Sequence, residues 1–206
     1  AAHRQFEADH RDRGWRRDAE AFGRAGGILL GDLLLVWSME MFTGCGLPAD
    51  AVARATPLLD TMRTEVISGQ FLDVFAQAEP IGAVDLMTLV PQVVEFKTSR
   101  YTVIRPLQLG AALAGGSDAA LVALGAYGSP LGRAFQFRDD VLGVFGEPEV
   151  TGKPAGDDLR EGKRTVLVAH ALELASDTAK ERLAGLLGNA ELDATGGVVT
   201  ASRVGI

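Results

Sequence analysis

Nearly every residue from 26 to 42 is apolar, on all sides of a helical wheel, and this run constrains the fold more than any other feature of the chain. Such a pattern is typical of a helix that other helices surround. Its most apolar part, residues 28–37, is interrupted by Gly31 and Asp32 and falls short of the roughly 18 to 20 residues that a membrane span needs. We therefore expect a buried helix, no membrane span, and Asp32 as a hydrogen-bonded structural acid inside the protein.

The composition also favours an all-α fold with a packed core. Hydrophobic residues make up 47% and charged residues 23% of the 206 residues, close to globular averages, which excludes a disordered or a fibrous chain. Aromatic residues make up only 6%, while Leu, Ala, Val and Gly dominate, and this favours helices packed through small side chains over a sheet. The length fits one core, so we expect a single domain over residues 1–206.

Charge and cysteine content narrow the function classes. The net charge is −7, so the chain as a whole repels a phosphate backbone, and we expect no nucleic-acid partner. The single cysteine, Cys45, excludes a disulfide framework within the chain and thiolate zinc sites, and it fits a reducing compartment. No signal peptide is visible at the start of the sequence. These features predict a cytoplasmic protein.

Helical spacing of apolar residues predicts several helices with turn signals between them. Residues 1–17 are rich in Arg and His and are expected to form polar surface. A turn is expected at residues 115–117, a charged loop at residues 147–163, and no strong pattern follows residue 189. The predicted helices cover residues 18–42, 51–59, 61–78, 83–108, 118–144 and 165–187.

The residues that point to chemistry lie near the end of the helix predicted over residues 118–144 and in the loop after it. Gln136 lies three residues before Asp139 and four before Asp140, so all three can share one helix face. Adjacent carboxylates repel unless a cation offsets them, and Mg²⁺ prefers a few carboxylates with substrate phosphates and water. Lys153 and Lys163 add point charges suited to diphosphate oxygens. Together these residues indicate a metal-bridged phosphate site.

Spacing alone does not decide between this interpretation and a simpler one. Acidic pairs are common near helix ends, and charge runs usually face water. Asp139 and Asp140 could therefore be solvated acids followed by a charged surface loop. Similarly, Gln70 and Asp73 could form a hydrogen-bonded polar pair on a helix face.

The longer sequence context resembles a known family. The segments FQFRDDVLGVFG (residues 135–146), GK (152–153) and GDDLREGK (156–163) resemble the second aspartate-rich region of trans-isoprenyl diphosphate synthases, the polyprenyl synthetase family. Further segments are similar to the family in the same order, and the resemblance extends from residue 3 to residue 175. These are Leu30-Gly31-Asp32, Glu65 with Gly69-Gln70 and Asp73, and Lys97-Thr98-Ser99. The resemblance implies an isoprenoid-synthase helical bundle around a central apolar cavity.

The resemblance also implies a role for particular side chains. Thr98 and Gln136, with Lys97, would act at the carbon where positive charge develops. The metal site would contain Asp139, Asp140 and Asp157, binding Mg²⁺ through the substrate diphosphate. The diphosphate-binding residues would be Lys97, Lys153, Lys163 and Gln70, with Gln70 lining the same cavity.

The reaction that the resemblance implies is a Mg²⁺-dependent trans-prenyl transfer. Isopentenyl diphosphate and an allylic diphosphate would condense to a short-chain prenyl diphosphate of farnesyl or geranylgeranyl type, and the enzyme would be a homodimer. Two other functions stay open. The chain could be a non-catalytic prenyltransferase-like subunit that modulates a partner, or a terpene cyclase on the same kind of bundle.

Two departures from the family pattern bear on these expectations. Gly143 stands where the family's second motif usually carries a third Asp. The family's first aspartate-rich motif, with the arginines that bind isopentenyl diphosphate, would precede His3. We therefore expect this sequence to be part of a larger domain, without its N-terminal helices and part of its C-terminus.

Overall fold

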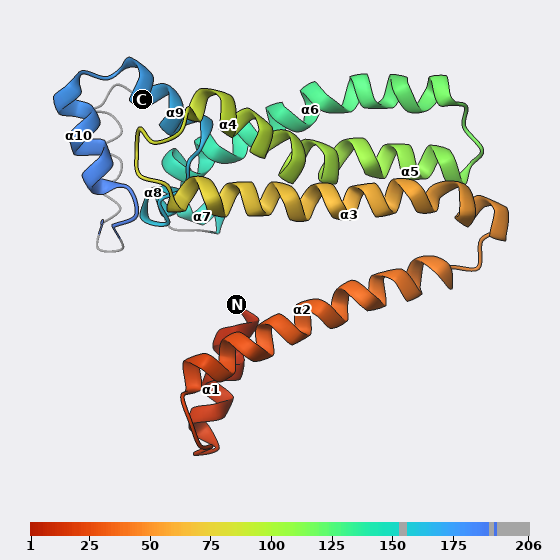
Figure 1. The fold of residues 1–206 in the computed structure, drawn as a ribbon, viewed down its shortest axis with the longest axis horizontal. Helices are drawn as coiled ribbons and strands as arrows, with labels where there is room; N and C mark the ends of the chain where they lie inside the picture. Colours follow the sequence, from red (N-terminus) through yellow and green to blue (C-terminus); the bar gives the residue numbers. More distant parts are fainter. Residues whose placement is uncertain (153–155, 190–191, 193–206) are drawn as a thin grey trace. The chain divides into compact units, whose positions relative to one another are not determined.

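The structure is a computed structural model that describes residues 1–152, 156–189 and 192 (Figure 1). Every regular element among these residues is a helix, which confirms the prediction of an all-α fold. Lys153 and nearly all of the weakly patterned tail after residue 189 lie outside the described residues. Backbone contacts divide the chain into two compact units, Ala1–Val52 and Ala53–Ile206.

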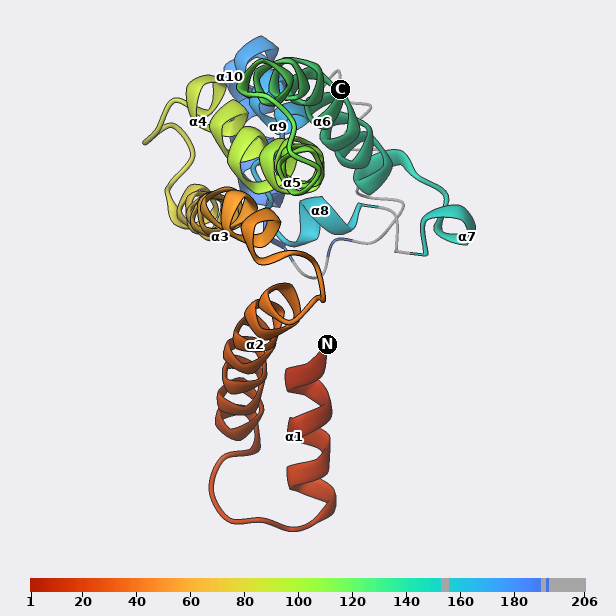
Figure 2. The same cartoon turned by 90° about the vertical axis from the view of Figure 1, so that its right-hand side faces the viewer.

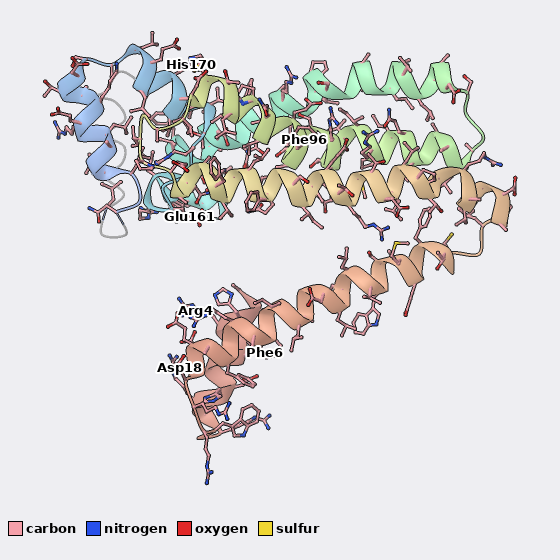
Figure 3. All side chains as sticks on the ribbon, viewed as in Figure 1. Arg4, Phe6, Asp18, Phe96, Glu161 and His170 are labelled. Carbon is pink, nitrogen blue, oxygen red and sulfur yellow. The ribbon has the colours of Figure 1, made fainter. Side chains whose placement is uncertain are left out.

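The first unit is a pair of packed helices, α1 (Ala2–Asp12) and α2 (Ala19–Thr43). Residues 1–17 were predicted only as polar surface, so α1 was missed. Asp18 caps α2 by accepting a hydrogen bond of 2.7 Å from the Ala21 N–H. The two helices approach closely because Gly26 leaves room for the ring of Phe6, which is labelled in Figure 3 and would lie 2.8 Å from a Cβ at that position.

The prediction that residues 26–42 are surrounded by other helices is wrong for this structure. Apolar side chains of α2 are widely exposed, with Leu29 at 67% and Met41 at 74% of their full area, and Asp32 is exposed too. The physical reason is that α1 alone packs extensively against α2 within their unit. Among the described residues α2 is the one helix long and apolar enough to cross a membrane, a test that core helices of soluble proteins also pass.

The second unit contains the remaining helices, most of them packed lengthwise. Helix α5 lies between α3 and α6 in both Figure 1 and Figure 2. Elements α4, η1 and α5 follow one another without a break, and η1 packs most extensively against α6. The elements are α3 (Ala49–Ala78, which begins in the first unit), α4 (Leu86–Val93), η1 (Val94–Ile104), α5 (Arg105–Leu113), α6 (Asp118–Phe145), α7 (Pro148–Thr151), α8 (Asp157–Arg160), α9 (Val166–Leu174) and α10 (Asp177–Leu186).

Several predicted boundaries differ from the observed ones. The helices predicted over residues 51–59 and 61–78 are a single helix, α3, because Pro57 removes only one backbone donor and does not end the helix. The helix predicted over residues 165–187 is two helices, because Ser176 caps the second by accepting a hydrogen bond from the Ala179 N–H. The loop predicted over residues 147–163 contains two short helices.

Element η1 is a π-helix, in which each backbone N–H reaches five residues back, and two glycines bring its neighbours close. A Cβ at Gly69 of α3 would lie 2.5 Å from the backbone nitrogen of Lys97. A Cβ at Gly132 of α6 would lie 2.5 Å from Ser99 Cα. Real Cβ atoms do not approach backbone atoms this closely. Only glycine at these two positions permits the observed packing of η1 against α3 and α6.

We predict that Gly132→Ala lowers the free energy of unfolding by about 1–3 kcal/mol, because its Cβ would meet the backbone of η1. Gly110→Ala is the matched control, since Gly110 is a helical glycine of α5 with nothing within 4 Å of its added Cβ. This control should gain about 0.5–1 kcal/mol through the lower entropy of the unfolded chain. Denaturant unfolding of both variants measures the difference, and equal effects would contradict the packing described.

A second prediction concerns Glu65, whose carboxylate accepts hydrogen bonds from Arg100 and Arg105. Burial acts to raise its pKa, but the two guanidinium groups outweigh burial and lower the pKa of Glu65 below its ordinary value. A lowered carboxyl pKa gives stability that is fully present above about pH 4.3 and is lost as the pH falls below that value.

Glu65→Gln should therefore lower the free energy of unfolding by about 3 kcal/mol near pH 7, and by progressively less as the pH falls below 4.3. Denaturant unfolding between pH 7 and pH 3 measures the difference from the native protein. Asp60→Asn is the control, because it removes an exposed carboxylate–arginine pair from the same helix. A difference for Glu65→Gln that stays constant over this pH range would contradict the assignment.

Candidate functional site

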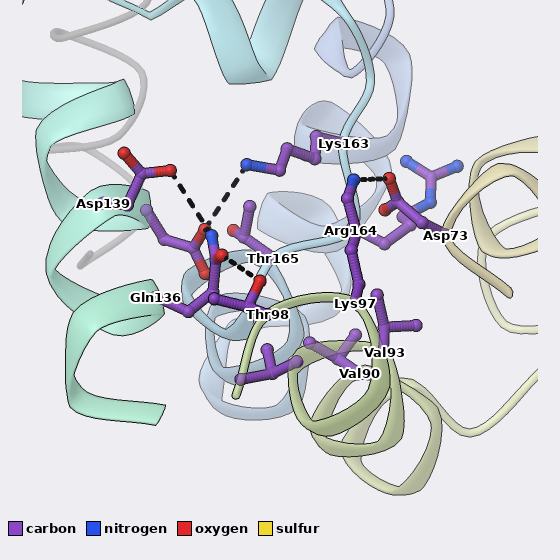
Figure 4. A pocket seen from close by; sticks show the side chains of 12 residues that line it. Asp73, Val90, Val93, Lys97, Thr98, Gln136, Asp139, Lys163, Arg164 and Thr165 are labelled. Atoms are coloured by element: carbon purple, nitrogen blue, oxygen red, sulfur yellow. Dashed lines mark hydrogen bonds and ion pairs between the residues drawn. The ribbon is translucent and has the colours of Figure 1, made fainter. Parts of the chain in front are cut away.

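A cavity of about 170 Å³ opens in the second unit and gathers most of the predicted site residues (Figure 4). Its wall combines side chains from α3, α4, η1 and α6 with the segment between α8 and α9. The lining residues are Asp73, Val90, Val93, Val94, Lys97, Thr98, Gln136, Asp139, Asp140, Lys163, Arg164 and Thr165. Most of the lining residues are therefore polar or charged, and Val90, Val93 and Val94 add apolar surface.

The structure brings six of the nine predicted site residues together in this cavity and leaves two others outside it. The six are Lys97, Thr98, Gln136, Asp139, Asp140 and Lys163. Gln70 is exposed and does not line the cavity. Asp157 is also absent from the cavity lining, and its Oδ1 lies 3.5 Å from Arg160 Nη2. Lys153 lies outside the described residues.

Helical spacing explains why Asp73 reaches the cavity and Gln70 does not. Glu65, Gly69 and Asp73 are four residues apart along α3, so they form one stripe, and Gly69 of that stripe faces η1. Gln70 follows Gly69 directly and therefore points about 100° away from it. Asp73, in contrast, is buried and accepts a hydrogen bond of 2.5 Å from the Lys97 ammonium.

A second stripe, on α6, holds the opposite side of the cavity. The Thr98 hydroxyl donates a hydrogen bond of 2.5 Å to Gln136 Oε1. The Gln136 amide nitrogen donates to Asp140 Oδ1 at 2.8 Å and to Asp139 Oδ2 at 3.4 Å. The expected shared face of Gln136, Asp139 and Asp140 is thus present. Because the Thr98 hydroxyl donates its proton to Gln136, the Thr98 oxygen can act toward a further group only as an acceptor.

Lys163 lies against two carboxylates at the cavity edge. Its Nζ is 3.5 Å from Asp140 Oδ1 and 3.2 Å from Asp158 Oδ2. Burial acts to lower the pKa of Lys163, but the nearby charges of Asp158 and Asp140 outweigh burial and raise it. Burial raises the pKa of Asp140, which is only 2% exposed, against the opposing effects of Gln136 and Lys163. Lys163 is therefore a fixed cation at neutral pH.

Asp158 is a residue of the site that sequence reasoning did not single out. Leu159 of α8 is buried against Val144 and Val168, which anchors α8 beside α6. A Cβ built at Gly143 would meet the Asp158 carboxylate, with Cγ only 2.7 Å away. The carboxylate of Asp158 thus fills the space beside Gly143, where the family's third motif Asp is expected. The sequence offered one signal, the acidic pair in GDD, but did not show which of the two faces α6.

Arg164 is a further cation of the cavity that was missed. Its guanidinium donates to the backbone oxygens of Gly162 at 3.3 Å and Glu79 at 3.5 Å. Burial lowers the pKa of Arg164, which nevertheless stays charged at neutral pH. With Lys97 and Lys163, the cavity presents three cations from two separate segments of the chain.

This arrangement can bind an anion with several oxygens, together with a divalent cation. Asp139 is exposed, and Gln136 is its one described hydrogen-bond partner, so its oxygens are open. Among the described residues, no group of three or more acidic, histidine or cysteine side chains could hold a metal unaided. A cation here would need oxygens from a ligand, as Mg²⁺ commonly takes from phosphates. The donor set therefore fits a phosphate-bridged Mg²⁺.

Comparison with known proteins points to one family. The model of the polyprenyl synthetase family matches residues 9–199. The chain is 32% identical over 171 residues to a short chain isoprenyl diphosphate synthase of Methanothermobacter thermautotrophicus, covering 82% of this chain and 51% of that protein. It is 38% identical over 155 residues to a geranylgeranyl diphosphate synthase of Mycobacterium tuberculosis, covering 75% and 43%. The chain spans about half the length of these relatives.

A solved structure is similar over almost the whole chain. Geranylgeranyl pyrophosphate synthase from Corynebacterium glutamicum, complexed with isoprenyl diphosphate and magnesium, is 44% identical in sequence with a TM-score of 0.90. The match covers 99% of this chain and 58% of that one. The fold expected from the sequence, an isoprenoid-synthase bundle, is the fold of this solved structure.

The position of Asp158 beside Gly143 gives a testable prediction. Gly143→Ala should lower the free energy of unfolding by about 1–3 kcal/mol, because the new Cβ must displace the Asp158 carboxylate. The cost should be clearly smaller in an Asp158→Ala background, where the displaced atoms are absent. Denaturant unfolding of the native protein, both single variants and the double variant measures this coupling. Additive effects would contradict the contact.

Proposed function

This chain belongs to the polyprenyl synthetase family, and from that premise we propose that it forms the diphosphate-binding part of a Mg²⁺-dependent short-chain trans-prenyltransferase. The substrates would be isopentenyl diphosphate and an allylic diphosphate, and the product a prenyl diphosphate of farnesyl or geranylgeranyl type. The relatives with similar sequences include geranylgeranyl and farnesyl diphosphate synthases, which supports this range of products.

One observation carries the proposal: two lysines, a carboxylate pair and a threonine–glutamine pair converge on one cavity from three separate segments. Lys97 and Thr98 come from η1, Gln136 and the adjacent aspartates from α6, and Lys163 from the turn after α8. A charged surface loop would not place these side chains around a shared space. The convergence thus supports the functional interpretation of the motif over solvated surface charge.

The residues present fit Mg²⁺ held jointly with a diphosphate. Asp139 has open oxygens at the cavity edge and would contact the ion, while Asp140, held by Gln136 and Lys163, would support it. When bound, Mg²⁺ offsets negative charge on the leaving diphosphate. Lys97 and Lys163 would bind the remaining diphosphate oxygens by exchanging Asp73 and Asp158 for phosphate. The C. glutamicum synthase is complexed with magnesium, which supports this choice of ion.

The proposed reaction starts with cleavage of the bond between C1 of the allylic group and its diphosphate oxygen, which takes the electron pair. Lys97 and Lys163 stabilise the growing negative charge on the diphosphate. The Thr98 oxygen, oriented by Gln136, turns lone pairs toward the positive charge that develops at C1. The double bond of isopentenyl diphosphate then forms the new bond to C1, and a proton leaves to the released diphosphate. The valine side chains of the cavity exclude water that would trap the cation.

Two alternatives remain in view because each makes a different prediction. A non-catalytic subunit is favoured by Gly143, since the second motif then offers two of its usual three carboxylates. A terpene cyclase would ionise one diphosphate without adding isopentenyl diphosphate. The lysines of the cavity favour an enzyme over a non-catalytic subunit. The resemblance of residues 152–163 to a synthase favours the synthase over the cyclase.

Product analysis of the complete gene product separates these functions. The protein is incubated with Mg²⁺ and an allylic diphosphate, with and without isopentenyl diphosphate. Chain elongation that requires both substrates supports the proposal. A hydrocarbon or alcohol formed from the allylic substrate alone would identify a cyclase, and the absence of any product would identify a non-catalytic subunit.

We predict that Asp139→Ala lowers kcat about a hundredfold or more, because the open carboxylate would no longer contact the metal. Asp118→Asn is the matched control, since it changes an exposed aspartate at the other end of the same helix. Steady-state kinetics over a range of Mg²⁺ concentrations measures the effect. Unchanged turnover in Asp139→Ala would remove Asp139 from the metal site.

We also propose, from the family resemblance, that the complete protein is a cytoplasmic homodimer. The apolar side chains of α2 are exposed in this structure, which supports the proposal that another surface covers them in the complete protein. Sedimentation velocity of the complete protein tests the oligomeric state, and a monomer at micromolar concentration would contradict it.

A further inference from the structure

The length of the π-helix η1 needs a physical explanation. A π-helix is usually a single turn inserted in an α-helix, often at a functional site. Here it extends over eleven residues, Val94–Ile104, and at its end the Arg105 N–H still bonds to the Arg100 carbonyl five residues back. A local preference for the α-helix must be overcome along this whole segment. Contacts specific to the wider helix must therefore hold it.

The segment also contains a polar group that costs stability. The hydroxyl of Ser99 is buried against Gly132 and has no hydrogen-bond partner within the described part of the chain. The glycine contacts permit η1 to lie close to α3 and α6, but contact through glycine does not itself favour five-residue over four-residue hydrogen bonds. Another interaction must select the register.

Charged residues spaced by five supply such an interaction. Glu95, Arg100 and Arg105 are five residues apart, and Arg100 Nε lies 3.3 Å from Glu95 Oε1. In an α-helix, residues five apart point about 140° away from each other. In a π-helix, which has more residues in each turn, the offset between residues five apart falls to roughly 50°. In this charge ladder, Glu95–Arg100–Arg105, each neighbouring pair therefore lies closer together in the π register than in the α register.

Glu65 closes the ladder from the neighbouring helix α3. Its carboxylate accepts hydrogen bonds from Arg105 at 2.7 and 2.8 Å and from Arg100 at 2.5 Å. One carboxylate holds both guanidinium groups more readily when the two side chains leave their helix at similar angles. Glu65 is only 8% exposed, so these interactions are poorly screened by solvent. Its contacts thus favour the π register directly.

The register decides where the side chains of the cavity point. More residues in each turn mean a smaller angle between consecutive side chains than the 100° of an α-helix. This smaller step lets the neighbours Lys97 and Thr98 line the same cavity, one bonded to Asp73 and the other to Gln136. A return to the α register would rotate both side chains about the helix axis by an angle that grows with each residue after Val94, and would so move them away from Asp73 and Gln136.

We propose that Glu65 is a positioning residue, which acts with the Glu95–Arg100–Arg105 ladder to hold η1 in the π register and so aim Lys97 and Thr98 at the diphosphate. The inference rests on the proposed function, because the aim of these two side chains matters only if the cavity binds a diphosphate. Glu65 itself lies outside the cavity lining, so it would act on the ligand only through other residues.

The structural part is tested by amide hydrogen exchange of the complete protein and its Glu65→Gln variant. Peptides covering residues 94–104 should exchange at least about tenfold faster in the variant, because opening of η1 becomes easier. Arg105→Lys, which keeps the charge but loses the paired contacts, should act in the same direction and serves if Glu65→Gln fails to fold. Unchanged exchange in residues 94–104 for a folded variant overturns the proposal.

The functional part is tested by the binding of inorganic pyrophosphate with Mg²⁺, measured by calorimetry. Glu65→Gln should weaken binding about tenfold, and kcat for condensation should fall by about tenfold to a hundredfold, as expected for misplaced groups. In a Lys97→Ala background, Glu65→Gln should weaken binding by clearly less than tenfold, because the residue it positions is gone. Equal effects in both backgrounds overturn the proposal.

Two controls separate positioning from loss of stability. Leu183→Ala removes a buried side chain of α10 and matches the lost stability without touching η1. Asp60→Asn removes a carboxylate–arginine pair from α3 outside the ladder. Both should bind pyrophosphate as the native protein does, and weakened binding in either overturns the proposal. If the native protein binds no pyrophosphate, the proposed function fails, whereas the exchange measurement still decides the register.

Discussion

The close approach of η1 to α3 at Gly69 and to α6 at Gly132 is the contact on which the rest of the second unit depends. One turn beyond Gly69 along α3 lies Asp73, and one turn beyond Gly132 along α6 lies Gln136. The two contacts therefore set the distance at which Asp73 meets Lys97 and Gln136 meets Thr98. Larger side chains at the glycine positions would separate the helices and widen the cavity.

Electrostatics then determines how this cavity can respond to a ligand. Asp73 holds the ammonium of Lys97, and Asp158 and Asp140 hold that of Lys163. Each lysine is thus placed before binding, which lowers the entropy cost of ordering it around a ligand. A diphosphate must in turn compete with the carboxylates for the same ammonium groups. We therefore expect ligands of high charge density to gain most from this exchange.

Composition and helical spacing predicted the fold class and the shared helix face of three site residues, whereas the other site residues were expected only from the family resemblance. Gln136, Asp139 and Asp140 share a face as helical spacing requires, and Asp18 and Ser117 cap the helices that follow them. Contacts between segments could not be predicted in this way. The pairing of Lys97 with Asp73 depends on the packing of η1 against α3, and spacing within α3 alone did not distinguish Asp73 from Gln70.

The apolar run over residues 26–42 also shows that contacts between segments cannot be predicted from local sequence. Its composition predicted a buried helix, but burial is a property of the partners, and within the first unit α1 alone packs extensively against α2. The five-residue spacing of Glu95, Arg100 and Arg105 was a readable signal, yet it has no meaning in the α register that helix prediction assumes.

Gly143 shows why a motif position is better compared in space than along the chain. Read along the sequence, the second aspartate-rich motif has lost a carboxylate at this position. In the structure the Asp158 carboxylate fills the space beside Gly143, because Leu159 anchors α8 against Val144. A glycine is then required at position 143, since any larger residue would displace Asp158 and weaken its hold on Lys163. The change at one position and the carboxylate supplied by another helix are thus parts of one arrangement.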